Sequence, residues 1–451
     1  MVEKAEKREQ LPLDTVHQAI QNEDLSSLEP IFETLHPAEA ALLLESIPST
    51  ERQIIWELLY AKIGGEILPH LNDSVRADLI EQMENDQLVA ATEGLDTDDL
   101  ADLIQEMPES VTQQIIESLD EQNRKRLEAV LTYPEDSAGG LMNVDTVTVR
   151  ADIEVDVVMR YLRRLGTLPE TTDNLMVVDR EGLYLGTLSL IKLLTSKTDT
   201  EISEIMDPST EAISADSDET DVVRLFEHRD WVSAPVVDQT GKLLGRITID
   251  DIVDLIRDQG DHGFMGMAGL NEEDDVFAPA LKSSKRRTIW LGVNLLTALL
   301  ASWVIGQFGA TIEEMVALAI LMPVVASMGG IAGSQTLTLV IRAMALGQIS
   351  RRNARTLLIK EIAVGLINGS IWALVIGLIT YFWFGNGALG YVIAAAMIIN
   401  LSVAAFFGAI IPPLLKQVGA DPALAGGVIL TTVTDVIGFF VFLGLAAIFL
   451  V

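Results

Sequence analysis

The chain has no cysteine among its 451 residues. Disulfide bonds, thiolate metal sites and cysteine nucleophiles are therefore excluded. Histidine is also scarce, and none of the five histidines lies in the long apolar stretches of the C-terminal part; they are His17, His36, His70, His228 and His262. A histidine-rich zinc or iron site is therefore not expected.

Positive charge is scarce as well, because 31 Lys and Arg oppose 65 Asp and Glu and leave a net charge of −34. Residues 285–451 hold nine Lys/Arg and five Asp/Glu, so the first 284 residues carry the whole acidic excess. Such a surface repels phosphate, which argues against nucleic acid as a partner, and attracts divalent cations. No secretion signal is visible, because residues 1–30 are charged and lack an apolar core segment.

The C-terminal part contains five stretches that are long and apolar enough to cross a lipid bilayer, which takes roughly 20 residues. A Gly/Asn-rich turn at residues 385–390 separates the third stretch from the fourth. The fifth is interrupted by a single acid, Asp435. The expected spans are about 288–312, 315–341, 362–384, 391–415 and 422–450.

The flanking charges predict the orientation of these spans. Basic residues lie at 285–287, between the second and third spans, and at Lys416 between the fourth and fifth. The opposite loops hold only Glu313 and Glu314 or no charge. This alternation places the acidic N-terminal part in the cytoplasm and the C-terminus outside the cell membrane.

Residues 31–137 are expected to form a helical domain after an N-terminal extension at 1–30, since apolar residues recur at three- and four-residue spacing. The segment 43–48 is loosely repeated at 103–108, and an Ile-Ile pair follows each copy. Such a repeat is typical of stacked helix pairs that form a small superhelix.

A sharper repeat follows, in which Val177-Val178-Asp179, Gly182 and Gly186 recur 59 residues later without a gap. Each copy predicts a strand, a glycine turn, a second strand and a helix that begins at Ser189 or Thr248. The repeat resembles a tandem pair of CBS domains, here at 138–200 and 201–258. That resemblance implies an α/β fold and a candidate ATP site.

The stretch 245–251 looks like the nucleotide-contacting segment of CBS domains, in which Thr248 and Asp251 would hold a ribose. The first copy has Lys192 where the second has Asp251, so the second copy is the better candidate for ATP. The alternative is that Thr248 and Asp251 only cap a helix.

The domain order, together with several motifs, resembles the MgtE family of magnesium channels and transporters over nearly the whole chain. The motifs lie at residues 133–142, 322–323, 329–336, 421–422 and 431–438. The resemblance implies a multidomain membrane protein with an α-helical superhelical N domain, an α/β tandem CBS pair and an all-α five-helix transmembrane domain at 285–451. A connecting, plug-like helix is expected at 259–284.

The resemblance also implies a homodimer in the cytoplasmic membrane, with Mg²⁺ as substrate and regulator. The chain departs from the family pattern at Ile331, where Asn is usual. It departs again in the connecting segment, where Gln259, His262 and Gly263 replace common acids. The share of that segment in cation sensing is therefore expected to be reduced.

Asp435 is the only acid within the five expected spans. It is the candidate pore residue, because an ionisable group in an apolar span usually lines a pathway. Mg²⁺ prefers oxygen ligands and releases its waters reluctantly, so carboxylate and hydroxyl oxygens suit it. Two copies of Asp435 would face one another across a dimer axis. In the structural alternative, Asp435 is neutral or accepts hydrogen bonds from Thr432 and neighbouring helices.

The acids of the N-terminal part are expected to sense Mg²⁺, because facing carboxylates repel each other until a cation bridges them. This would close the pore when cytosolic Mg²⁺ is high. By family position the candidate ligands are Asp98, Asp102, Asp216, Asp218, Asp250, Asp251, Asp254, Asp258 and Asp421. For most of them the alternative is a solvated surface carboxylate.

Two other functions fit the sequence: a broader Mn²⁺, Co²⁺ or Ni²⁺ transporter regulated by nucleotide, and a membrane-anchored CBS sensor that moves no ion. Asp435 argues against the sensor. An enzyme is not expected, because no nucleophile–base pair, phosphate-binding loop or metal–histidine cluster can be found.

Overall fold

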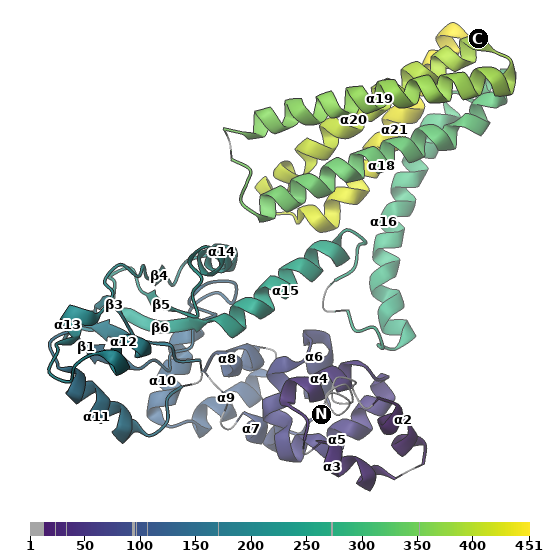
Figure 1. The fold of residues 1–451 in the computed structure, drawn as a ribbon. Helices are drawn as coiled ribbons and strands as arrows, with labels where there is room; N and C mark the ends of the chain where they lie inside the picture. The colour runs from purple at the N-terminus through teal and green to yellow at the C-terminus, as the bar shows by residue number, and fades with distance from the viewer. Residues whose placement is uncertain are drawn as a thin grey trace, which may run out of the picture. The chain divides into compact units, whose positions relative to one another are not determined.

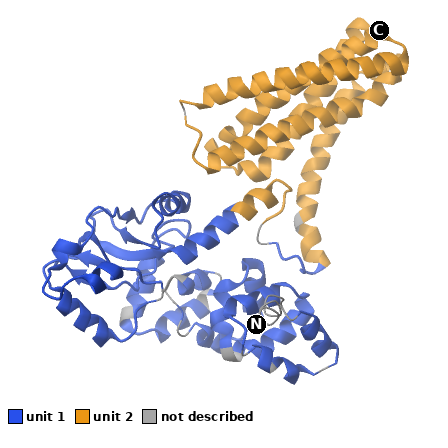
Figure 2. Cartoon of the chain, viewed as in Figure 1, with its two compact units in different colours: residues 1–259, 273–279 blue, residues 260–272, 280–451 orange. Residues whose placement is uncertain are grey.

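The computed structural model describes residues 13–22, 24–32, 34–92, 95, 97–105, 107–169, 171–271, 274–350 and 352–451. The chain forms two compact units, coloured separately in Figure 2. The N-terminal unit comprises residues 1–259 and 273–279, and the C-terminal unit comprises residues 260–272 and 280–451.

The part of the N-terminal unit that precedes the two sheets forms only helices over its described residues (Figure 1). Pro48 and Pro108 occupy the N-cap positions of α5 and α9, so the loose sequence repeat corresponds to two helix pairs, α4/α5 and α8/α9. The elements are α2 (Leu13–Gln21), η1 (Leu25–Leu28), α3 (Glu29–Phe32), α4 (Pro37–Glu45), α5 (Ser49–Ile67), η2 (Leu68–His70), α6 (Asp73–Ile80), α7 (Asn85–Ala91), α8 (Thr97–Gln105), α9 (Glu109–Ser118) and α10 (Glu121–Val130).

The described part of the expected N-terminal extension, residues 13–30, belongs to this helical core. Val16, Ala19 and Leu28 are buried in the same hydrophobic cluster as the later helices. These residues were expected to lie outside the helical domain. They join it because α2 is amphipathic and buries its apolar face. The neighbouring charged residues obscure this amphipathic pattern in the sequence.

Two small sheets of the same topology follow, each with its first strand parallel and its third antiparallel to the central strand. The pairing register shifts after Val177 in one copy and after Val236 in the other. Gly182 and Gly241 both have φ of 85°, a conformation that favours glycine. The elements are β1 (Thr148–Arg150), α11 (Val155–Leu165), β2 (Asn174–Val178), β3 (Tyr184–Ser189), α12 (Leu190–Thr195), α13 (Ile202–Ile205), β4 (Ile213–Ser214), α14 (Glu219–Arg229), β5 (Ser233–Val237), β6 (Leu243–Thr248) and α15 (Ile249–Gly266).

The segment expected to be one connecting helix, 259–284, is only partly helical. Helix α15 ends at Gly266 and the next helix begins at Ala280, while the described residues between them lie outside helices. Asp275 in this stretch forms a buried ion pair of 2.9 Å with Arg52 of α5. Arg52 also donates to the carbonyls of Leu44 and Ile47, so its side chain is held in place. The ion pair with Asp275 therefore favours an irregular segment that lies against α5 over a continuous helix.

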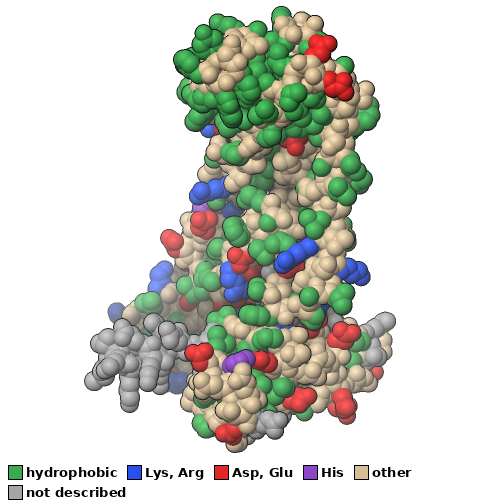
Figure 3. Space-filling view, turned by 90° about the vertical axis from the view of Figure 1, so that its right-hand side faces the viewer, with side chains coloured by type: hydrophobic (Ala, Val, Ile, Leu, Met, Phe, Trp, Pro, Cys, Tyr) green, Lys and Arg blue, Asp and Glu red, His purple; other side chains and the backbone are tan. Residues whose placement is uncertain are grey.

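Among the described residues of the C-terminal unit, five helices are long and apolar enough to span a membrane, which confirms the expected number of spans. Helix α20 contacts α18, α19 and α21 and is the central one. In the view of Figure 3, hydrophobic side chains gather most densely at the upper end of this unit. Its helices are α16 (Ala280–Gly306), α17 (Gly309–Glu314), α18 (Ala317–Ala345), α19 (Ala354–Phe384), α20 (Gly387–Gln417) and α21 (Pro422–Phe449).

The helix ends follow local chemistry, and several lie away from the expected span limits. Gly385 ends α19 in a left-handed conformation, and the Asn386 side chain caps α20 by accepting from the amides of Ala388 and Leu389. Helices α16 and α19 begin eight residues before the expected spans at 288 and 362. The reason is that apolarity marks the lipid-facing part of a helix, whereas charged residues continue the helix beyond it.

Candidate functional site

Asp435 lies in the middle of α21 and is partly buried. Its threonine neighbours direct their hydroxyl protons to their own helix: Thr431 donates to the carbonyl of Gly427 and Thr432 to that of Val428, both at 2.7 Å. Within the described part of the chain, the Asp435 carboxylate accepts no hydrogen bond and forms no ion pair. The expected alternative, a hydrogen bond from Thr432, is therefore absent from these residues.

The glycine-rich segment of α18 packs closely against α20 and α21. A Cβ atom on Gly329 would lie 2.4 Å from Nδ2 of Asn400, and one on Gly333 would lie 3.0 Å from Leu430. Gly330 has more room, with Thr431 at 3.9 Å. Ile331, the departure from the family pattern, is 56% exposed, so it does not take part in this packing.

Asn400 of α20 is a buried polar residue at this helix junction that the sequence did not single out. Its Nδ2 donates to the carbonyl of Val325 at 2.8 Å. The side chain lies between Gly329 of α18 and Gly438 of α21, where a Cβ would approach Nδ2 to 2.9 Å. The sequence signal was an amide side chain inside the apolar run expected at 391–415.

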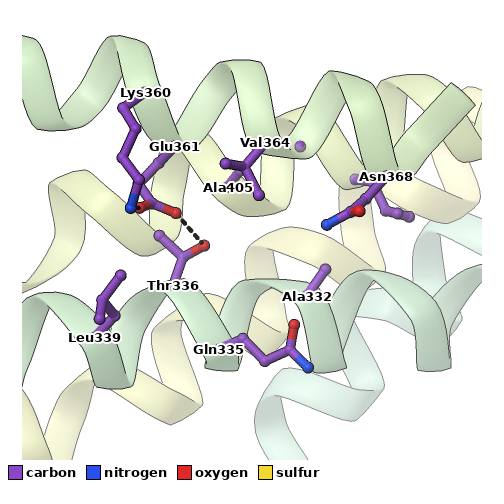
Figure 4. A pocket seen from close by; sticks show the side chains of 11 residues that line it. Ala332, Gln335, Thr336, Leu339, Lys360, Glu361, Val364, Asn368 and Ala405 are labelled. Carbon is purple, nitrogen blue, oxygen red and sulfur yellow. Dashed lines mark hydrogen bonds and ion pairs between the residues drawn. The ribbon is translucent and has the colours of Figure 1, made fainter.

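Glu361 is a second acid inside the transmembrane helices, so the expectation that Asp435 is the only one is wrong. The error arose because the third span was expected to begin at Ile362, whereas α19 begins at Ala354. The Glu361 side chain is 4% exposed; it accepts from Thr336 Oγ1 at 3.3 Å and pairs with Lys360 Nζ at 2.7 Å. It lines a cavity of about 190 Å³ between α18 and α19 (Figure 4).

Asp421 caps the N-terminus of α21, where its carboxylate accepts from the amides of Ala423 at 2.8 Å and Leu424 at 3.1 Å. The same carboxylate contacts Nε2 of His262 at 3.1 Å. This contact places His262 directly beside a candidate cation ligand. His262 is also one of the residues at which the chain departs from the expected acidic pattern.

Thr248 and Asp251 lie together where β6 ends and α15 begins. The amide and hydroxyl of Thr248 donate to Oδ2 of Asp251 at 3.3 and 3.2 Å, and the hydroxyl also donates to Asp250. The three candidates thus hydrogen-bond to one another at a helix start. This geometry fits the capping alternative and does not test nucleotide binding.

Most of the other candidate sensing acids cap a helix, accept a hydrogen bond or form an ion pair. Asp218 caps α14, and Asp216 accepts from Gln239 at 3.2 Å. Asp102 is exposed on α8, whereas the side chain of Asp98 on the same helix lies outside the described residues. Asp254 and Asp258 each pair with Arg257 at 3.4 Å.

Two acids of the N-terminal unit are held in surroundings that disfavour their charge. Burial raises the pKa of Asp258, and the nearby carboxylates of Asp254 and Asp73 raise it further against the opposing effect of Arg257. Burial likewise raises the pKa of Glu219, to which Asp218, Asp136 and Asp258 add. Carboxylates of α6, α14 and α15 therefore lie close enough to repel.

Asp73, Asp136 and Glu219 are members of this crowded set that the sequence did not predict. The available signals were weak, because Asp136 lies in a recognised motif and Glu219 follows a candidate, while nothing marks Asp73. Among the described residues, no group of three or more His, Asp or Glu is arranged to hold a metal ion. The candidate acids of the crowded set are therefore near one another but do not form a complete metal coordination shell.

Three family models match the chain. They are described as a divalent cation transporter (residues 322–445), the MgtE intracellular N domain (35–136) and a CBS domain (202–258). The magnesium transporter MgtE of Thermus thermophilus is 31% identical over 97% of this chain and 98% of its own length. The chain belongs to the MgtE family. Its membership confirms the expectation that it is not an enzyme, because the family consists of transporters.

The MgtE family likeness extends to other organisms and to solved structures. The magnesium transporter MgtE of Bacillus subtilis is 26% identical over 93% of both chains. A crystal structure of the cytosolic domain of the Mg²⁺ channel MgtE in complex with ATP is 33% identical and covers 54% of this chain and 99% of its own, with a TM-score of 0.49.

Proposed function

We propose that this protein transports Mg²⁺ across the cytoplasmic membrane along a path that passes Asp435. The observation that carries the proposal is a carboxylate in the middle of a transmembrane helix with no partner among the described residues. A charge in that position is costly unless a pathway or a cation compensates it. A hydrated Mg²⁺ would be attracted through its waters and would remain weakly enough bound to leave.

Asp435→Asn tests this proposal, because the amide is nearly isosteric and removes the charge. Mg²⁺ uptake into proteoliposomes should fall to background, while size-exclusion elution stays unchanged. Asp421→Asn is the matched control, since asparagine is also a good N-cap and Asp421 lies at the start of the same helix; its effect on flux should be smaller. A well-folded Asp435→Asn protein with wild-type uptake would refute the pathway.

We further propose that two copies of the chain form a homodimer, with the N-terminal unit in the cytoplasm and the C-terminus outside. One Asp435 per chain gives a single carboxylate, and a two-fold axis would bring two together. The basic residues at 285–287 and Lys416 support this orientation.

Regulation by cytosolic Mg²⁺ is the third part of the proposal. Burial, and to a lesser extent neighbouring carboxylates, raise the pKa values of Asp258 and Glu219. Mg²⁺ bound among the acids of α6, α14 and α15 would relieve this repulsion and favour a compact, pore-closing state. Of the predicted ligands, Asp218, Asp254 and Asp258 belong to this crowded set; Asp98, Asp102, Asp216, Asp250, Asp251 and Asp421 remain candidates.

ATP is a candidate ligand of the second CBS domain at Thr248 and Asp251. The support is the related cytosolic domain solved with ATP and the position of both side chains at a helix N-terminus, which favours anions. Replacing Asp251 with Lys, as at Lys192 of the first copy, should abolish ATP binding measured by calorimetry if the contact exists.

A further inference from the structure

The buried carboxylate of Glu361 has no part in the proposed ion path, yet the protein retains it inside a transmembrane helix. Burying a charge is costly unless it is paired and hydrogen-bonded. Both requirements are met here, because Lys360 pairs with Oε1 and Thr336 donates to Oε2. The Lys360 side chain is exposed, whereas the carboxylate is almost fully enclosed.

The Glu361–Thr336 hydrogen bond joins two helices that otherwise meet little. Helices α18 and α19 each pack extensively against α20, and far less against each other. Between them lies the cavity shown in Figure 4, where Glu361 and Thr336 point toward one another across the gap. The polar link therefore replaces the side-chain packing that is missing there.

Thr336 in turn lies close against α20. A Cβ on Gly408 of α20 would lie 3.0 Å from Cβ of Thr336 and 2.8 Å from the carbonyl of Gly333. Gly333 itself packs on Leu430 of α21, five residues before Asp435. Close contacts therefore connect the part of α18 around Thr336 with α21.

We propose that Glu361 is a positioning residue for transport, which holds α18 through Thr336 so that α21 presents Asp435 to the ion. This inference rests on the proposed path through Asp435. In this role Glu361 acts as a hydrogen-bond acceptor for Thr336 and does not itself contact the transported ion.

The test is Mg²⁺ uptake by the full-length protein in proteoliposomes, with the maximal rate and the half-saturating concentration measured separately. Thr336→Val removes the donor with little change of shape, and its maximal rate should fall about tenfold at an unchanged half-saturating concentration, as for a small misalignment. Glu361→Leu should act alike, and the double variant should be no slower than either single one. Glu361→Gln keeps an acceptor for Thr336 and should retain at least half of the rate.

Asn368→Leu is the control, because Asn368 lines the same cavity and makes no hydrogen bond to Glu361 among the described contacts; its uptake should equal that of the wild type. Equal losses in Glu361→Gln and Glu361→Leu with a raised half-saturating concentration would mean that the charge itself binds the cation, which overturns the proposal. Wild-type uptake by Thr336→Val, or additive losses in the double variant, would overturn it too. If Asp435→Asn transports normally, the path fails independently of this result.

Discussion

Carboxylates of one chemical type have different surroundings in this chain, and the surroundings determine what each can do. Asp421 is held by two helix amides and His262, and Glu361 by a lysine and a threonine. Asp435 accepts nothing from the described residues, and Asp258 lies among other acids. Of these four carboxylates, Asp435 and Asp258 are therefore the ones whose surroundings compensate their charge least.

At the residue scale, Asp258 predicts a pH effect on the stability of the N-terminal unit. Its pKa is raised in the folded state, so the folded protein binds this proton more tightly than the unfolded chain does. Without divalent cations, the contribution of Asp258 to stability should therefore be fully present below the ordinary carboxylate pKa and be lost as pH rises through the raised one. Thermal unfolding of the full-length protein in a chelator, followed between pH 4 and pH 7, measures this.

Asp258→Asn mimics the protonated acid. It should raise the unfolding temperature of the N-terminal unit at pH 7 without Mg²⁺ and reduce the further rise that Mg²⁺ produces. Glu227→Gln, which removes an exposed acid from α14, is the control. A lower unfolding temperature for Asp258→Asn would show that its ionised form stabilises the fold through Arg257.

At the scale of elements, the C-terminal unit depends on close approaches between helices at glycine. Membrane helices gain little from apolar burial alone, so small residues at contacts allow the packing that holds them together. Gly329 and Gly333 of α18 make room for Asn400 and Leu430, and Gly408 of α20 admits Thr336.

Gly408→Ala should destabilise this unit, because the added Cβ would lie 2.8 Å from the carbonyl of Gly333. Overpacking of this kind costs about 1–3 kcal/mol. Gly444→Ala is the matched control: it lies in α21, its Cβ would lie 3.9 Å from Phe308, and it gains the same helix propensity. Thermal unfolding in detergent should place Gly408→Ala several degrees below Gly444→Ala, and equal values would show that the helices can separate there without cost.

At the scale of the whole molecule, charge is divided between the two parts of the chain. The net charge of −34 comes entirely from residues before 285. Most of the acidic part can therefore be removed without removing any of the five transmembrane helices found among the described residues.

Deleting residues 1–258 should leave Mg²⁺ uptake that no longer falls as Mg²⁺ rises on the side of the deleted part. Titration with Mg²⁺ at constant ionic strength distinguishes bound cations from general screening, since monovalent salt also screens exposed charges. The full-length protein should be inhibited by Mg²⁺ and not by the matched sodium salt. If the truncated protein keeps its full inhibition, the sensor lies in the C-terminal unit.

The sequence by itself determined the domain classes, the five spans, the tandem repeat and the isolated acid Asp435. These follow from local properties: apolar runs, periodic spacing and glycine turns whose backbone conformation is set within a few residues. The tertiary structure decided what depends on distant partners. Arg52 lies 223 residues from its partner Asp275. Asn400 fits between glycines of two other helices. The surroundings of Asp258 include Asp73 of α6. Glu361 was missed because α19 begins at Ala354, before the apolar run by which the sequence located the third span.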